Sequence, residues 1–389
     1  MGLALAAIHC AGQTAKTPEQ QRQTALALEQ QGKNSEAEAA WYAVLKANPS
    51  SPEAYAHLGL LEARQEHYTE AVTLYRKALA LGPQIPGLRL NLGLALFKGG
   101  EPKKAIKEFT LLLKNAPPSS PEAHHLTTLI GMAYFGLAEY AEAVPYLKDA
   151  AAHDGRNPPL LLSLAHSCLW SKQYQCVLDV YHQILALNAD SAEADLLAGE
   201  ALDELKDNAA ATEQFRAAVK ADPKLPNVHF GLAYLLWTQK RYPEAASEFK
   251  AELANVPDHI QAKLYLADSD IQLNRMEDAQ PLLETVEGQA PAIPLAHLDL
   301  GIIYTEAGRN EDAMRELTAA EKLAPDDVNI HWRLGRLYRL LGNKDQAKAE
   351  FDKASTLNKA ADDDLHKKIA NGNAHPPPAQ SPADAPKDK

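Results

Sequence analysis

The sequence has few cysteines, no long apolar run and no excess of basic residues, and each of these absences excludes a class of protein. The three cysteines among 389 residues, Cys10, Cys168 and Cys176, are too few for a disulfide framework and have no zinc-binding spacing. Because no apolar run is long enough to span a bilayer, we expect no membrane span. The net charge of -12 lacks the basic footprint that nucleic-acid binding requires, so we expect no nucleic-acid partner.

Catalytic motifs are also missing from the sequence. It contains no glycine-rich phosphate loop after a strand, no H-E-x-x-H pattern and no G-x-S-x-G pattern. The 14 histidines fall at scattered register positions, which favours solvated or packing roles for them. We therefore predict that the chain is not an enzyme and that it holds no metal or other cofactor.

What the sequence does contain is a repeat of 34 residues. Ten repeats begin at residues 18, 52, 86, 124, 158, 192, 226, 260, 294 and 328, and one of the steps is 38 residues long. Position 8 is always glycine or alanine, position 20 is alanine except at Val177, and position 24 is always large and apolar. Position 32 is proline in seven of the ten repeats, which indicates the end of a helix. Because four positions of the repeat agree across ten copies, the pattern cannot have arisen by chance.

Each repeat is predicted to form two antiparallel helices, A and B, with one apolar face each. Positions 4, 7, 8 and 11 share a face of helix A, and positions 20, 24, 27 and 28 share a face of helix B. Small residues at positions 8 and 20 let the backbones approach, and the residue at position 24 fills the neighbouring gap. Thr17 and Ser51 precede prolines at position 1 and are predicted N-caps. The four extra residues before repeat four predict a longer helix A that begins near Pro121.

This pattern resembles the tetratricopeptide repeat family over roughly nine tenths of the chain. The resemblance implies an all-α fold, a right-handed superhelical solenoid of antiparallel helix pairs in which helix A lines the concave face. Two ligand signatures of the family are not met. No repeat pairs lysine at position 5 with asparagine at position 9, which argues against a chaperone adaptor with that clamp. Only Asn91 matches the asparagine ladder that some members carry at position 6, and no catalytic domain follows.

The two ends of the chain do not fit the repeat. Residues 1–17 combine a short apolar stretch with small residues, which suggests the end of a secretory signal, although no basic residue precedes the stretch. We therefore expect export to the periplasm or cell envelope, with a cytoplasmic protein as the alternative. Residues 18–361 comprise the ten repeats. Residues 362–371 are predicted to form a capping helix through Leu365 and Ile369, and residues 372–389 a disordered tail.

Cys168 and Cys176 flank the predicted turn between the two helices of repeat five. In an exported protein they could form a disulfide, provided that their Cα atoms lie within roughly 7 Å. We favour the alternative, in which both are small apolar residues in a packed turn.

The positions that line the concave face in this family carry apolar and aromatic residues here. An apolar stripe open to water indicates a surface for a partner, and burial between adjacent A helices is the alternative. The predicted groove residues are Leu90, Leu94, Phe97, Met132, Phe135, Leu162, Leu169, Trp170, Phe230, Tyr234, Trp237, Leu264 and Ile271.

Charged residues in the same groove would fix the direction of a bound segment. Arg333, Arg336 and Arg339 are three apart and so share a face of their helix, and a solvated charged stripe is the alternative. The predicted acidic patch comprises Glu193, Glu200, Asp203, Glu204 and Asp268.

Together these observations predict a non-catalytic protein-interaction scaffold whose groove holds a segment of a partner protein or a peptide. Two other functions are left open by the sequence. The chain could present substrates to a separate enzyme, or it could be a self-associating spacer of the cell envelope. Neither the partner nor the oligomeric state follows from the sequence.

Overall fold

Twenty α-helices and no strand make up residues 17–187 and 191–370, the parts of the chain that the computed structural model describes. Side chains are described up to residue 360. The described residues do not include residues 1–16 of the predicted signal, among them Cys10, or the predicted tail. The side chains of Leu365 and Ile369 are also not described. Within the described range, no helix has the length and apolar content that a membrane crossing needs.

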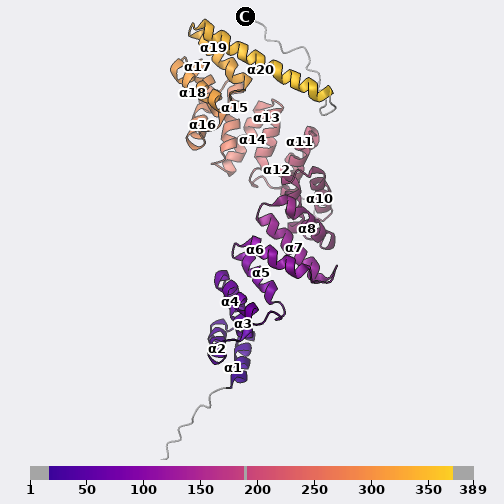
Figure 1. Cartoon of the computed structure of the whole chain (residues 1–389). Coiled ribbons are helices and arrows are strands. Elements are labelled where there is room, and N and C mark those ends of the chain that lie inside the picture. The colour runs from indigo at the N-terminus through magenta and orange to yellow at the C-terminus, as the bar shows by residue number, and fades with distance from the viewer. Residues whose placement is uncertain (1–16, 188–190, 371–389) are drawn as a thin grey trace, which may run out of the picture. The chain divides into compact units, whose positions relative to one another are not determined.

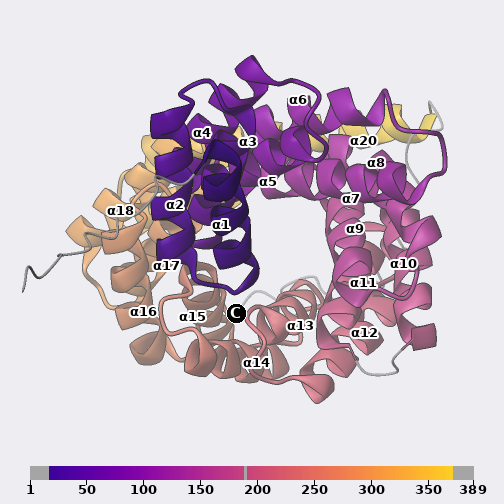
Figure 2. The ribbon, with the colours of Figure 1, turned by 90° about the horizontal axis from the view of Figure 1, so that it is seen from below.

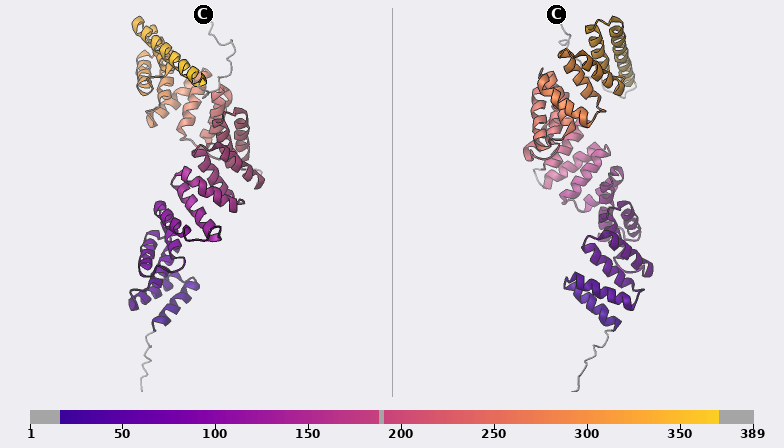
Figure 3. Two further views of the ribbon diagram at one scale, coloured as in Figure 1. Left: turned by 45° about the vertical axis from the view of Figure 1, so that its right-hand side comes forward. Right: turned by 90° about the vertical axis from the view of Figure 1, so that its left-hand side faces the viewer.

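The chain divides into two units, residues 1–205 and 206–389, which we call the N-terminal and the C-terminal unit. In each of them, consecutive helices fold back on one another as antiparallel pairs (Figure 1), and the pairs follow one another in sequence order (Figure 3). The all-α class predicted from the sequence is confirmed.

The N-terminal unit contains five helix pairs and one further helix. Its helices are α1 (Pro18–Gln30), α2 (Asn34–Ala47), α3 (Pro52–Arg64), α4 (Tyr68–Leu81), α5 (Leu88–Lys98), α6 (Pro102–Leu113), α7 (Pro121–Gly136), α8 (Tyr140–His153), α9 (Pro158–Trp170), α10 (Tyr174–Leu187) and α11 (Ala192–Glu204). The helices with odd numbers are the A helices of the repeats. Figure 2 shows α9 and α11 beside each other, with α10 on their outer side.

The C-terminal unit begins with the B helix of repeat six and continues with four further pairs. Its helices are α12 (Asn208–Ala221), α13 (Val228–Thr238), α14 (Tyr242–Asn255), α15 (Ile260–Gln272), α16 (Met276–Gln289), α17 (Pro294–Glu306), α18 (Asn310–Leu323), α19 (Val328–Leu340) and α20 (Lys344–Ala370). The helix pairs begin at or close to the repeat starts read from the sequence, and the division into ten repeats stays our proposal for the domain organisation.

The helix starts follow the predicted capping chemistry. The Thr17 side chain accepts a hydrogen bond from the Gln20 backbone N–H at 3.3 Å, and Ser51 caps α3 in the same way through Ala54. These bonds satisfy N–H groups that have no partner inside the helix. The longer A helix predicted before repeat four is also present, because α7 starts at Pro121 and has 16 residues where α3 has 13.

Close packing inside each pair depends on the small residue at position 8. A Cβ atom on Gly59 would lie 2.7 Å from the ring of Tyr75, and one on Gly335 would lie 2.6 Å from the ring of Phe351. Real Cβ atoms do not approach carbon that closely, so a larger residue at these two glycines would require the rings to shift. The ring at position 24 thus occupies the space that the absent side chain at position 8 leaves, as the sequence predicted.

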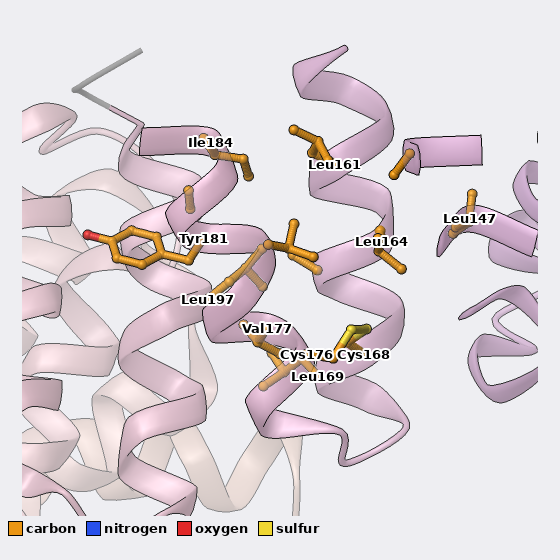
Figure 4. Packing of buried hydrophobic residues seen from close by; sticks show 14 of the residues in the cluster. Leu147, Leu161, Leu164, Cys168, Leu169, Cys176, Val177, Tyr181, Ile184 and Leu197 are labelled. Atoms are coloured by element: carbon orange, nitrogen blue, oxygen red, sulfur yellow. A yellow bond between two sulfur atoms is a disulfide. The ribbon is translucent and has the colours of Figure 1, made fainter. Parts of the chain in front are cut away.

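Helices α9 and α10 are joined by a disulfide, contrary to our expectation of two unlinked cysteines. The sulfur atoms of Cys168 and Cys176 are bonded, and the Cα atoms are 5.8 Å apart. Figure 4 shows the bond near the turn between the two helices, close to Leu169 and Val177. Both cysteines are buried, so the turn that brings them within bridging distance also packs them into the core.

The last helix also differs from the prediction. Helix α20 runs without a break from Lys344 to Ala370, so residues 362–370 continue the B helix of repeat ten and are not a separate capping helix. Position 32 of this repeat is Lys359, where seven other repeats have proline, and residues 344–370 contain neither glycine nor proline. Nothing in the local sequence therefore stops the helix.

Candidate functional site

An open pocket of about 490 Å³ lies on the A-helix side of repeats two to four, and we call it the α3–α5 pocket. Helices α3 and α5 contact each other there and supply most of its lining. Its residues are Leu60, Ala63, Arg64, Glu66, Tyr68, Asn91, Leu94, Ala95, Lys98 and His125. The pocket combines apolar carbon with polar groups, which is the composition of sites that bury a ligand and orient it.

The polar groups of the α3–α5 pocket are largely unused by the fold. Within the described residues, neither the Asn91 amide nor the Lys98 ammonium has a hydrogen-bond or ion-pair partner, and His125 has none either. Arg64 makes a long ion pair of 3.6 Å with Glu29. Polar side chains that a fold needs are normally hydrogen-bonded, so these groups are available to a ligand.

The predicted groove residues of the N-terminal unit have different environments. Leu94 lines the pocket, and Leu169 is buried in the core and offers no surface. Trp170 is 65% exposed and stacks on Tyr140 with ring centroids 6.1 Å apart. The others are partly buried against core clusters: Leu90, Phe97, Met132, Phe135 and Leu162.

Four of the five predicted acidic residues lie on α11, whereas Asp268 belongs to the C-terminal unit. Glu193 is 3.0 Å from the Nε2 atom of His166, so it already has a partner. Glu200 is partly buried, and the loss of solvation raises its pKa to about 7. Asp203 is partly buried and Glu204 is exposed. Four of the predicted acidic residues thus form a strip along α11, and Asp268 is separated from them in the sequence.

In the C-terminal unit the predicted groove aromatics contact one another. The ring of Tyr265 on α15 lies 4.8 Å from Trp237 and 5.1 Å from Tyr234, and Tyr234 stacks on Phe230 at 6.1 Å. We call these four residues the α13–α15 ring cluster. Tyr265 was missed by the sequence analysis because it occupies position 6, which was not among the groove positions considered.

Leu264 and Ile271, the remaining predicted groove residues of this unit, are buried. Both belong to the core cluster formed with α16 and α17, and less than a tenth of each is exposed. Residues at positions 5 and 12 of α15 therefore pack under the neighbouring helix pair. The alternative of burial between adjacent helices is correct for these two residues.

Two carboxyl groups lie beside the ring cluster with little access to water. Asp268 accepts a hydrogen bond from the indole N–H of Trp237. Asp299 on α17 is 1% exposed, and its Oδ2 atom has no hydrogen-bond partner. Burial raises the pKa of Asp299 well above its usual value, the neighbouring Asp268 raises it further, and Arg333 acts in the opposite direction. Burial likewise raises the pKa of Asp268.

The three predicted arginines lie on α19, and each guanidinium is near an aromatic ring. Arg336 and Arg333 lie 5.1 and 5.7 Å from the ring of Trp332, and Arg339 lies 5.8 Å from the ring of Phe351. Trp332 is 47% exposed and was missed, although its position 5 is one of the groove positions. The contacts with Trp332 hold Arg333 and Arg336 along their own helix, whereas Arg339 reaches a ring on α20.

Histidine placement is more regular than the sequence analysis assumed. His229, His297 and His331 all occupy position 4 of their repeats, and each has its Nδ1 atom within 2.8 Å of a glutamate at position 23. Aligning the histidines by repeat position would have revealed this pairing.

Comparison with known proteins agrees with the fold. Two family models, both described as tetratricopeptide repeat, match this chain: one at residues 22–86, 178–226 and 210–260, the other at residues 62–130, 236–300 and 304–371. The second model alone matches more than half of the chain.

One similar curated protein is the DnaJ homolog subfamily C member 7 homolog of Schizosaccharomyces pombe. It is 26% identical over 254 residues, which are 56% of this chain and 52% of that protein. The match therefore spans about half the length of this relative.

Solved structures with a similar fold include a tetratricopeptide repeat protein from Parabacteroides merdae and the Cut9–Hcn1 complex of the APC/C. The first has a TM-score of 0.47 and 17% identity, and covers 69% of this chain and 97% of that one. The second has a TM-score of 0.43 and 14% identity, and covers 91% of both. With its helix pairs, its repeat columns and a family model that matches more than half of its length, the chain belongs to the tetratricopeptide repeat family.

Proposed function

We propose that this protein is a non-catalytic interaction scaffold that holds an extended peptide segment of a partner in the α3–α5 pocket. The observation that carries the proposal is that the pocket lining combines unused polar groups with apolar side chains. The Asn91 amide can both donate to and accept from a peptide backbone, while Leu60 and Leu94 offer apolar surface to a side chain. Repeat arrays of this kind use their extended faces for binding.

The charges around the pocket favour a partner segment with a carboxylate. Arg64, Lys98 and His125 line the pocket, against the single carboxylate of Glu66. Arg64 is shared with Glu29, so Lys98 is the cation of this set without an ion-pair partner among the described residues, and in a protein with a net charge of -12 it favours an acidic ligand. The proposed ligand is therefore a short extended segment that carries an apolar side chain next to an acidic residue or a C-terminal carboxylate.

A displayed library of random peptides, selected on the immobilised full-length protein, tests this proposal. We expect enrichment of sequences with an apolar residue beside an acidic one. A synthetic peptide of the most enriched sequence should bind at least tenfold more weakly to Lys98→Glu and several-fold more weakly to Asn91→Ala, measured by fluorescence polarisation. Bonds to charged groups contribute about 1.5–3 kcal/mol, and neutral hydrogen bonds about 0.5–1.5 kcal/mol.

Lys107→Glu is the matched control, because Lys107 is exposed on α6 in the same repeat and lies outside the pocket. It introduces the same charge change as Lys98→Glu. Equal losses of affinity in the two lysine variants would show a general charge effect and would refute the pocket as the binding site, as would a selection without acidic–apolar enrichment.

We also propose that the protein is exported to the periplasm or cell envelope. The disulfide between Cys168 and Cys176 supports this location, because structural disulfides form and persist in oxidising compartments. Mass spectrometry of the protein from its native cells, alkylated before lysis, tests the proposal. We expect the linked peptide pair, and full alkylation of both cysteines would contradict it.

A further inference from the structure

Two His–Glu–Glu triads recur at the same register positions in the last two repeats. The first comprises Glu287 on α16, His297 on α17 and Glu316 on α18. In each triad, the three candidate ligand atoms lie within 4.8 Å of one another. The members occupy position 28 of one repeat and positions 4 and 23 of the next.

The second triad repeats this arrangement one repeat further along. It comprises Glu321 on α18, His331 on α19 and Glu350 on α20. The Nδ1 atom of His331 is 2.7 Å from Glu350 and 3.9 Å from Glu321. Recurrence of the same three residue types at the same three positions, on three consecutive helices each time, indicates a shared structural role.

Each histidine is oriented by a backbone carbonyl behind it. The Nε2 atom of His297 lies 2.9 Å from the Pro291 carbonyl oxygen, and that of His331 lies 2.7 Å from the Pro325 carbonyl oxygen. Nε2 must therefore carry the hydrogen and donate it, because a carbonyl only accepts. This leaves Nδ1 directed at the carboxylates, the tautomer and orientation that metal-binding histidines adopt when their other nitrogen donates to a carbonyl.

The chain also contains simpler versions of the same contact. In repeat seven, His229 is 2.6 Å from Glu248, and position 28 of the preceding repeat is Val219. In repeat three, Arg89 takes the place of histidine and is 2.5 Å from Glu108. One basic side chain and one carboxylate are thus sufficient to join positions 4 and 23.

The additional glutamate at position 28 is not explained by that simple pair. With it, two carboxylates face a single imidazole in a largely buried place, and Glu316 and His297 are each less than a tenth exposed. Even a protonated imidazole leaves one negative charge, which Arg315 meets at 2.9 Å from Glu316 in the first triad and Lys353 at 3.3 Å from Glu321 in the second. Both cations are exposed and therefore screened by water, so they neutralise the carboxylates only in part. Buried charge of this kind is costly unless it is neutralised.

We propose that each triad binds one divalent transition-metal ion of the zinc type through the histidine Nδ1 and one oxygen of each glutamate. Two carboxylates, a neutral imidazole and a divalent ion sum to zero charge. Zinc ligands at 2.0–2.1 Å in a tetrahedral arrangement lie about 3.4 Å apart, so the donor atoms need only small side-chain shifts. Water fills the fourth position, and the proton that Nδ1 shares with the glutamate in the metal-free protein leaves to solvent.

The ions would connect five consecutive helices. The first joins α16, α17 and α18, and the second joins α18, α19 and α20, so α18 contributes to both sites through Glu316 and Glu321. We assign the ions a structural role because each of them would cross-link three packed helices. It is separate from the proposed peptide binding in the N-terminal unit.

Zinc titration of the full-length protein, stripped with chelator beforehand, tests the proposal. Isothermal titration calorimetry and metal analysis after desalting should give two zinc ions per chain. Thermal unfolding should shift upward by roughly 5 °C at saturating zinc. The double variant Glu287→Gln, Glu321→Gln should lose both ions and the shift. These two glutamates are partly exposed, so the variant should keep its circular dichroism spectrum and its unfolding temperature without zinc.

Glu248→Gln is the matched control. It removes the carboxylate from the pair of His229 and Glu248, which has no third candidate ligand among the described triads. It should still bind two zinc ions, and so should the pocket variant Lys98→Glu. The proposal is overturned if the wild type binds no zinc, if the double glutamine variant binds as many ions as the wild type, or if magnesium and calcium compete equally with zinc.

Discussion

The A helices of the two units differ at repeat position 6, and this difference changes the space between neighbouring A helices. In the N-terminal unit, position 6 of repeat three is Asn91, and an open pocket remains between α3 and α5. In the C-terminal unit, position 6 of repeat eight is Tyr265, whose ring contacts Tyr234 and Trp237 and occupies the corresponding space between α13 and α15. The residue at position 6 thus differs between the pair of A helices that leaves an open pocket and the pair whose space is occupied by partly buried rings.

This difference separates two kinds of residue that look alike in the sequence. Leu94 and Trp237 both occupy groove positions, yet Leu94 lines an open pocket while Trp237 packs on two tyrosines and donates to a buried carboxyl group. Substitutions should accordingly impair binding in the N-terminal unit and stability in the C-terminal unit.

The largest effect is expected for Trp237→Ala. Loss of the ring removes its contacts with Tyr234 and Tyr265 and leaves Asp268 with only the longer hydrogen bond from Gln272, so the free energy of unfolding should fall by about 3 kcal/mol. Urea unfolding followed by circular dichroism measures the change. Trp332→Ala is the control, because the Trp332 ring is exposed, and it should cost less than about 1 kcal/mol. Equal losses would mean that the ring cluster does not act as core.

The disulfide should contribute nearly as much to the N-terminal unit, and the C-terminal unit contains no cysteine. Replacing both cysteines, Cys168→Ser with Cys176→Ser, should lower the unfolding free energy by about 2–3 kcal/mol, the value for a loop of this size. Wild type treated with reductant should approach the stability of the double variant. If reductant leaves the wild-type unfolding curve unchanged, the link is not stabilising.

A pH-dependent effect is expected at Asp299. Its folded-state pKa is raised, so the proton is bound more tightly in the folded protein, and stability falls as pH rises above the pKa of the unfolded chain, near 3.8. Asp299→Asn cannot ionise and should therefore be more stable than wild type at pH 8. At pH 4 the two proteins should differ little. Urea midpoints at both pH values measure this, and a difference independent of pH would contradict the assigned pKa direction.

The smallest effect on stability is expected for Asn91→Tyr. This variant also tests the comparison between the two units most directly. The variant places in the α3–α5 pocket the residue that closes the equivalent space in the C-terminal unit. Peptide affinity should fall more than tenfold, while the unfolding free energy should stay within about 0.5 kcal/mol, because the new ring enters open space. Asn91→Gln keeps the amide and should retain most of the affinity. Tight peptide binding by the tyrosine variant would place the ligand elsewhere.

The fold was predictable from the sequence because each of its determinants is local. Pairing of small and large residues at positions 8 and 24, N-caps such as Ser51 and the early start of α7 at Pro121 are all visible in a window of one repeat. The long α20 could also have been expected, since Lys359 stands where most repeats have proline.

The candidate sites were harder to predict because they depend on contacts between repeats. Whether Ile271 faces solvent or the core is decided by the packing of α16 and α17, and the sequence of α15 alone does not contain that information. The same holds for Asp299, which is buried by its neighbours. The histidines at position 4 were accessible to sequence analysis, and only alignment by register was needed to find them.

The disulfide between Cys168 and Cys176 has a mechanical consequence. A pulling force applied to the two ends of a repeat array separates helix pairs one after another and lengthens the chain. In repeat five the force is transmitted through the sulfur–sulfur bond and not through the eight-residue span between the cysteines. About 27 Å of the chain's contour length is therefore not extended by the force. Helices α9 and α10 remain joined at their turn when their packing has been pulled apart, which keeps the pair ready to close again once the tension is released.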